Sequence, residues 1–110
     1  MIMIIATTDL IDGQRITKAV GLVQGNTIRA RHAGRDIMAA FRNLIGGEIT
    51  EYSQLMSEAR QQAIDRMIEA AEAQGANAIV GTRFVTSMIM SGASELLAYG
   101  TAVVVEPTSA

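Results

Sequence analysis

Hydrophobic positions along the chain follow two different periods. Runs rich in Ile, Val and Leu, typical of β-strands, lie toward both ends of the sequence. The middle has a helical period, with apolar residues recurring at spacings of three and four. The pattern predicts four strands, near residues 1–8, 15–25, 76–85 and 95–106, with a turn at Asp12-Gly13 between the first two.

Two helices are predicted between the second and third strands. The first covers residues 34–45, has its apolar residues on one face, and ends at the glycine joint Gly46 and Gly47. The second begins at Thr50, which suits an N-cap, and runs to about Gln74. Alanines are frequent in its apolar stripe and would allow close approach to a sheet. The element order is therefore β-β-α-α-β-β, in a single α+β domain over residues 1–106 with a loose tail at 107–110.

Composition suggests that part of the surface meets other protein. The chain has 110 residues, 49% hydrophobic and only 18% charged, whereas charged residues make up about 25% of an average soluble domain. A net charge of −2 argues against nucleic acid as a partner, because a phosphate-binding surface needs clustered Lys and Arg. No apolar run approaches the roughly 20 residues that span a bilayer. We therefore expect a soluble, cytoplasmic protein without a membrane partner.

Candidate metal ligands are few. The sequence has no Cys and a single histidine, His32, so a structural zinc site with its usual four Cys or His ligands is not available. Asp65, Glu69 and Glu72 form an acidic row on the second helix, which we interpret as a solvated outer face. Met88 and Met90 could form a soft-metal thioether pair, but in an apolar hairpin they are more typical of packing or an interface. The metal ligands, if any, are unknown from sequence, and no cofactor is expected.

Catalytic motifs are also absent. The sequence contains neither of the two common nucleotide-binding glycine loops, G-x-G-x-x-G and G-x-x-x-x-G-K-[ST]. No serine lies in a G-x-S-x-G elbow. We predict no catalytic residues and a protein that is not an enzyme.

A group of polar residues lies around the glycine joint: Arg35, Asp36, Arg42, Tyr52 and Arg60. One interpretation is structural, with ion pairs and hydrogen bonds fixing the two helices around the joint. The other is an anion-binding notch at the start of the second helix, where free N–H groups favour negative charge. Both interpretations stay open at this stage, and these five residues are the candidate ligand-binding set.

The chain resembles a known family. The segments "GRDIMAAFRNLIGGEITEYSQLMSEAR", "AQGANAIVGTRF" and "AYGTAVVV", in this order and spacing, are similar to the YbjQ-like family, also called the putative heavy-metal-binding domain family. The resemblance covers nearly the whole chain. It implies an antiparallel sheet with the short helix and the long helix packed across it, and a homopentameric ring. It implies no established activity, and the lack of Cys weakens the metal-binding name.

These observations lead to two functional hypotheses. The first is a non-enzymatic ring, with itself as partner, that binds a small ligand or ion in its cavity or at its subunit interfaces. We expect strand edges and apolar side chains of residues 1–6 and 96–105 to form those interfaces. The alternative is a heavy-metal-binding or metal-responsive protein that uses carboxylates and His32.

Overall fold

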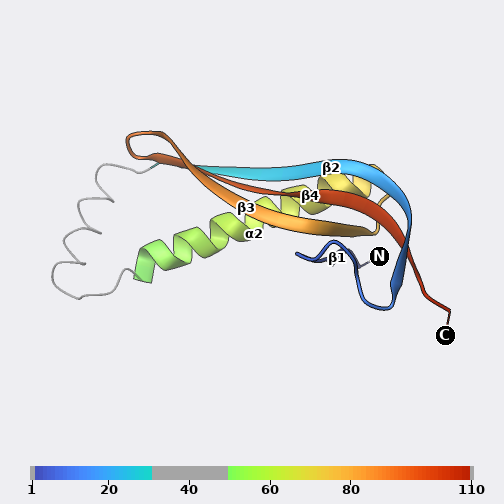
Figure 1. Cartoon of the computed structure of the whole chain (residues 1–110). Coiled ribbons are helices and arrows are strands. Elements are labelled where there is room, and N and C mark those ends of the chain that lie inside the picture. Colours follow the sequence, from blue (N-terminus) through green and yellow to red (C-terminus); the bar gives the residue numbers. More distant parts are fainter. Residues whose placement is uncertain (1, 31–49, 110) are drawn as a thin grey trace.

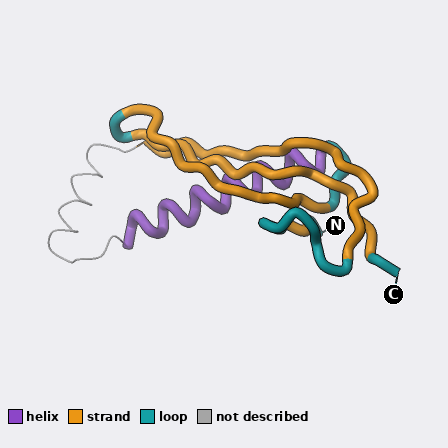
Figure 2. Tube along the Cα trace, in the orientation of Figure 1, coloured by secondary structure: helices purple, strands orange, loops and turns teal. Residues whose placement is uncertain are grey.

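The structure is a computed structural model that describes residues 2–30 and 50–109. In this part the chain forms a sheet of four strands and one helix (Figure 1). The elements are β1 (Ile4–Ile5), β2 (Gln14–Ala30), α2 (Thr50–Ala73), β3 (Ala78–Met90) and β4 (Ala93–Pro107). The three long strands run side by side, and α2 lies along one face of the sheet they form (Figure 2).

The strand order is β1-β3-β4-β2, which makes the sheet mixed. β4 pairs antiparallel with both β2 and β3, whereas β1 pairs in parallel with β3, with Ile4 opposite Ala78. The prediction of an antiparallel sheet is therefore wrong, as is the predicted order β-β-α-α-β-β: the described residues have the order β-β-α-β-β. The predicted short helix over 34–45 lies outside the described residues.

The first two strands do not form the hairpin that the Asp12-Gly13 turn suggested. The turn itself is present, with the Gln14 amide donating to the Ile11 carbonyl and Gly13 at φ 77°. However, β1 and β2 lie at opposite edges of the sheet, so the segment between them crosses it. The turn therefore steers the chain into β2 without pairing the strands, and β1 is left to join β3 in parallel.

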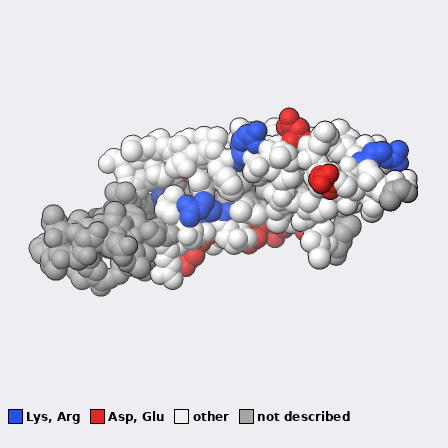
Figure 3. Space-filling view, turned by 60° about the horizontal axis from the view of Figure 1, so that its bottom comes forward, with Lys and Arg blue, Asp and Glu red and all other residues white. Residues whose placement is uncertain are grey.

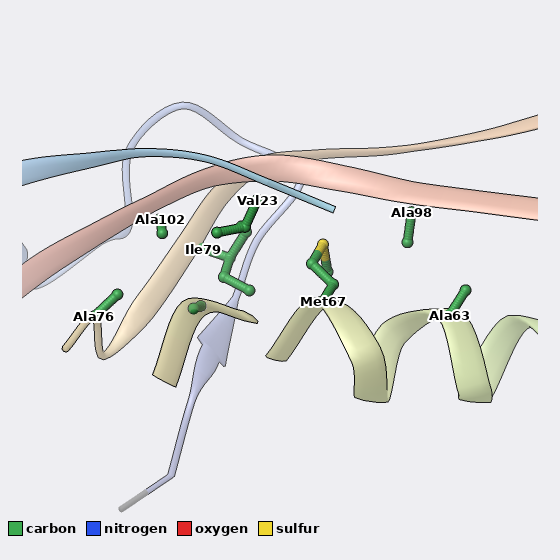
Figure 4. Packing of buried hydrophobic residues seen from close by; sticks show 8 residues of the cluster. Val23, Ala63, Met67, Ala76, Ile79, Ala98 and Ala102 are labelled. Atoms are coloured by element: carbon green, nitrogen blue, oxygen red, sulfur yellow. The ribbon is translucent and has the colours of Figure 1, made fainter. Parts of the chain in front are cut away.

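The core between sheet and helix is built from small residues on α2. Ala63 and Met67 face Val23, Ile79 and Ala98 on the strands, and all five are buried (Figure 4). Because the alanine side chain is short, the helix axis can approach the sheet closely. This confirms the predicted apolar stripe of the helix.

The point of closest approach is Gly25. A Cβ atom there would lie 2.9 Å from the carbonyl carbon of Arg66 and closer still to backbone atoms of Ala63 and Met67. The strand predicted over residues 15–25 does not end at Gly25, because β2 continues to Ala30. The missing side chain of Gly25 instead provides the space that the helix backbone occupies.

A second, smaller core lies on the opposite face of the sheet, near the chain termini. Ala78, Val80, Val103 and Val105 are buried there. Partly buried Ile4, Ile11 and Ile16 pack against this cluster. The N-terminal segment thus covers one end of the face that α2 leaves open.

Candidate functional site

Most of the polar residues predicted around the glycine joint, which we call the polar corner, lie outside the described residues. Arg35, Asp36, Arg42, Gly46 and Gly47 lie outside the described residues, and the Tyr52 side chain is not described either.

Arg60 is the described member of the set. It is exposed on α2 and donates from Nη2 to Ser57 Oγ at 3.2 Å, within its own helix. Both interpretations of the corner therefore stay predictions.

The described residues contain few side chains that could coordinate a metal ion. His32 lies outside them, and they contain no group of three His, Cys, Asp or Glu side chains that could hold an ion. Asp65, Glu69 and Glu72 are exposed on the outer face of α2, as predicted for a solvated row. Within that row, Asp65 accepts a hydrogen bond from Gln61 Nε2 at 2.9 Å.

The most distinctive surface is the hairpin that β3 and β4 form at the end of the sheet toward which the start of α2 also extends (Figure 1). Phe84 is 45% exposed and Met88 is 80% exposed. Both lie on the face of the sheet that α2 covers, because their partners on β4 are Ala98, which belongs to the core beneath α2, and Ser94 on the same face. Val85, next in sequence to Phe84, points to the opposite face and is 42% exposed. The hairpin thus exposes apolar side chains on both of its faces. Sequence patterning flagged the methionines but not this two-sided exposure.

The open face of β2 continues the apolar surface. Leu22 and Ile28 are 69% and 55% exposed, and they alternate with Val23 and Thr27, which are buried beneath the helix. At the hairpin tip, Ile89 and Met90 are also exposed.

The exposed apolar side chains of the hairpin and of β2 add up to a large area. We define the apolar arm surface as Leu22, Ile28, Phe84, Val85, Met88, Ile89 and Met90. With about 200 Å² of accessible area for each large apolar residue, their exposures amount to roughly 800 Å², which matches the roughly 800 Å² that one partner contributes to a standard protein interface. Figure 3 shows how sparse charged atoms are on the face that it presents.

Polar contacts join the free side of β2 to the helix. Arg29 donates from Nη2 to Gln62 Oε1 at 3.0 Å, and Arg66 donates from Nη1 to the carbonyl of Asn26. Buried Thr27 donates from Oγ1 to the Ala59 carbonyl at 3.0 Å. These hydrogen bonds hold α2 in place over β2.

No helix among the residues that the structure describes is both long and apolar enough to cross a membrane.

A family model and two similar proteins place the chain in the same family. A family model described as "Putative heavy-metal-binding" matches residues 3–106. A "UPF0145 protein" of Methanosarcina acetivorans is 59% identical over 101 residues, covering 92% of this chain and 95% of the relative. A second, from Clostridioides difficile, is 56% identical over 104 residues, covering 94% and 93%.

Solved structures of similar fold include the following one. It is a Pediococcus pentosaceus protein of unknown function from the DUF74 family, with a TM-score of 0.59 and 18% sequence identity. The match covers 94% of this chain and 98% of that one. At this identity the likeness extends to the fold alone.

Proposed function

Because the chain belongs to the YbjQ family, we propose that it is a non-enzymatic protein that assembles with itself into a ring. The ring would hold a small ligand or ion in its cavity or at its subunit interfaces. Five copies is the number that the family resemblance implies. The observation that carries the proposal is the apolar arm surface, which is exposed in the single chain.

Burial of this surface is large enough to drive association. At about 25 cal/mol per Å², covering roughly 800 Å² contributes on the order of 20 kcal/mol per copy before opposing terms. Association costs an estimated 4–15 kcal/mol in lost translational and rotational freedom. The low charge content of the chain, 18%, supports the same conclusion, because few ions need to be desolvated.

The structure changes which strands can form the interfaces. β4 is paired on both sides, with β2 and β3, so it has no free edge to offer a neighbour. Its Leu96, Ala98 and Ala102 are buried against α2 or within the sheet. Residues 96–105 can therefore contribute only side chains on the open face, and β2 and β3 replace them as candidate edges.

Light scattering coupled to gel filtration tests the ring. We expect one species of about five times the 11.7 kDa chain mass at micromolar concentration. Leu22→Lys with Ile28→Lys should lower the mass, because each places a charge in the apolar arm surface. Gln61→Lys, on the exposed outer side of α2, is the matched control and should leave the mass unchanged. A wild-type monomer would overturn the proposal.

Heavy-metal binding remains the alternative, favoured by the description of the family. The described donor set does not fit a tight site, since it lacks any cluster of three His, Cys, Asp or Glu. Its soft donors are methionine thioethers, among them exposed Met88 and Met90. Any ring site using His32 and carboxylates would be tested by elemental analysis of protein purified without chelator.

A further inference from the structure

The sheet has two free edges of different sequence. On one side, the N-terminal segment covers the start of β3, where the Gly81 amide donates to Thr8 and the Thr82 amide to Ala6. Beyond Thr82, no strand of the described part of the chain pairs with the outer edge of β3. On the other side, β2 pairs only with β4 among the described strands, which leaves its outer edge open.

The half of β2 from Leu22 to Ala30 has few of the devices that usually protect an edge strand, and its one charged residue, Arg29, is bonded to Gln62 of α2. Both register shifts of the β2–β4 ladder lie before Leu22, and Lys18 lies in that first half too. From Leu22 to Ala30 the ladder is regular and contains neither Pro nor Lys. Edge strands are normally blunted by bulges, Pro or Lys, so a long regular edge is a site for pairing with another chain.

We propose that the outer edge of β2 over Leu22–Ala30 pairs with the β3 edge over Arg83–Met90 of a second copy, so that the sheet continues from subunit to subunit. This inference rests on the proposed ring and specifies its interface. The two edges are similar in length and lie toward the same end of the sheet, since Ala30 and Met90 both stand opposite Ala93.

Strand direction makes this arrangement cyclic. β2 and β3 are each antiparallel to β4, so they run the same way. A rotation about an axis along the strands preserves that direction, so the β2 edge meets the neighbour's β3 edge in parallel. The interface is heterologous, and repetition closes a ring. Pairing of β2 with β2 would instead be antiparallel and would stop at a dimer.

The same arrangement covers both faces of the hairpin. On the open face, Val85 of one copy would lie next to the row of side chains on β2 of the next copy that contains Leu22 and Ile28. On the helix face, Phe84 and Met88 would meet the side of the neighbour's α2 that overhangs β2.

The neighbour's helix carries an apolar residue at this place. Leu55 is 37% exposed and lies two helical turns before Gln62, the residue that contacts Arg29 of β2. A single contact between copies thus accounts for exposed apolar groups on both faces.

Disulfide trapping tests the pairing directly, because the chain has no cysteine of its own. Gln24→Cys or Asn26→Cys on β2 is combined in one chain with Arg83→Cys, Val85→Cys or Ser87→Cys on β3, which samples several registers. Within one chain β4 separates the two strands by about 10 Å, beyond the roughly 7 Å that a disulfide allows between Cα atoms. A disulfide between them must therefore join two copies.

We expect at least one double variant to lose its monomer band on a non-reducing gel and to form a ladder that ends at the ring. The single-cysteine variants are the controls and should stay unlinked. A covalent dimer from Gln24→Cys alone would show that β2 pairs with itself and would overturn the inference. If no double variant links while light scattering still finds the ring, the inference fails and the ring stands. If the wild type is a monomer, the ring fails as well.

Discussion

Gly25 is the position where a single methyl group should affect the fold most. A Cβ atom there would fall within 3 Å of three backbone atoms of α2, in Ala63, Arg66 and Met67. Backbone atoms cannot swing aside as a flexible side chain can, so the helix must withdraw from β2 by on the order of 1 Å, and such a gap forfeits a quarter to a half of each contact's dispersion energy.

The cost of Gly25→Ala follows from three terms. Overpacking of a well-packed site costs about 1–3 kcal/mol. Withdrawal of the helix also weakens the hydrogen bond from Thr27 to Ala59, a contribution of about 1 kcal/mol. The lower entropy of the unfolded alanine chain returns about 0.4–1 kcal/mol. We expect a net loss of about 2–3 kcal/mol in the free energy of unfolding, or roughly 10–20 °C in Tm.

Urea unfolding followed by circular dichroism measures this loss. Gln24→Ala is the matched control, because it places alanine one residue away on the exposed, opposite face of β2. The control should lie within about 0.5 kcal/mol of wild type. All proteins must be compared at the same chain concentration, since assembly adds to apparent stability. If Gly25→Ala unfolds at the same urea midpoint as the control, the close contact between strand and helix is refuted.

Three further predictions concern the Thr27 hydroxyl, the Arg42 side chain and bound metal. Thr27→Val should lose about 1 kcal/mol, because the valine cannot donate to the Ala59 carbonyl; Thr27→Ser should keep most of it, and equal urea midpoints for the two would contradict this role of the hydroxyl. Arg42→Ala should lower Tm with secondary structure intact, and phosphate should not stabilise the wild type. An unchanged Tm together with phosphate-dependent stabilisation would instead support the anion-binding interpretation. Dialysed protein should retain no stoichiometric transition metal in elemental analysis, and one metal per chain that is lost in His32→Ala would show a real site.

Local patterns in the sequence predict the elements well but not their pairing. The alanine stripe predicts the packed face of α2, and the helix ends at Ala73, close to the predicted end at about Gln74, with Gly75 at φ 82° just beyond it. The Ala76 amide donates to the Ala71 carbonyl across that end. These features depend on neighbours within a few residues, which is why the sequence shows them.

Long-range features are harder to predict. Asp12-Gly13 signals a turn, but a turn does not say which strands will pair, and here they lie at opposite edges of the sheet. Gly25 marks the end of the predicted second strand, yet its role depends on a helix about 40 residues later in the chain. The two-sided exposure around Phe84 depends on where α2 stops covering the sheet.

The hairpin shows why this fold points toward assembly. A sheet with one helix can bury one of its faces, and the N-terminal segment covers part of the other through Ile4 and Ile11. Neither element covers the hairpin beyond Phe84, where apolar side chains emerge on both faces. A partner that packs on one side of the hairpin could bury only one of those faces. A neighbour that offers both a strand edge and a helix flank hides both, and in this chain β2 and α2 lie together in the required arrangement.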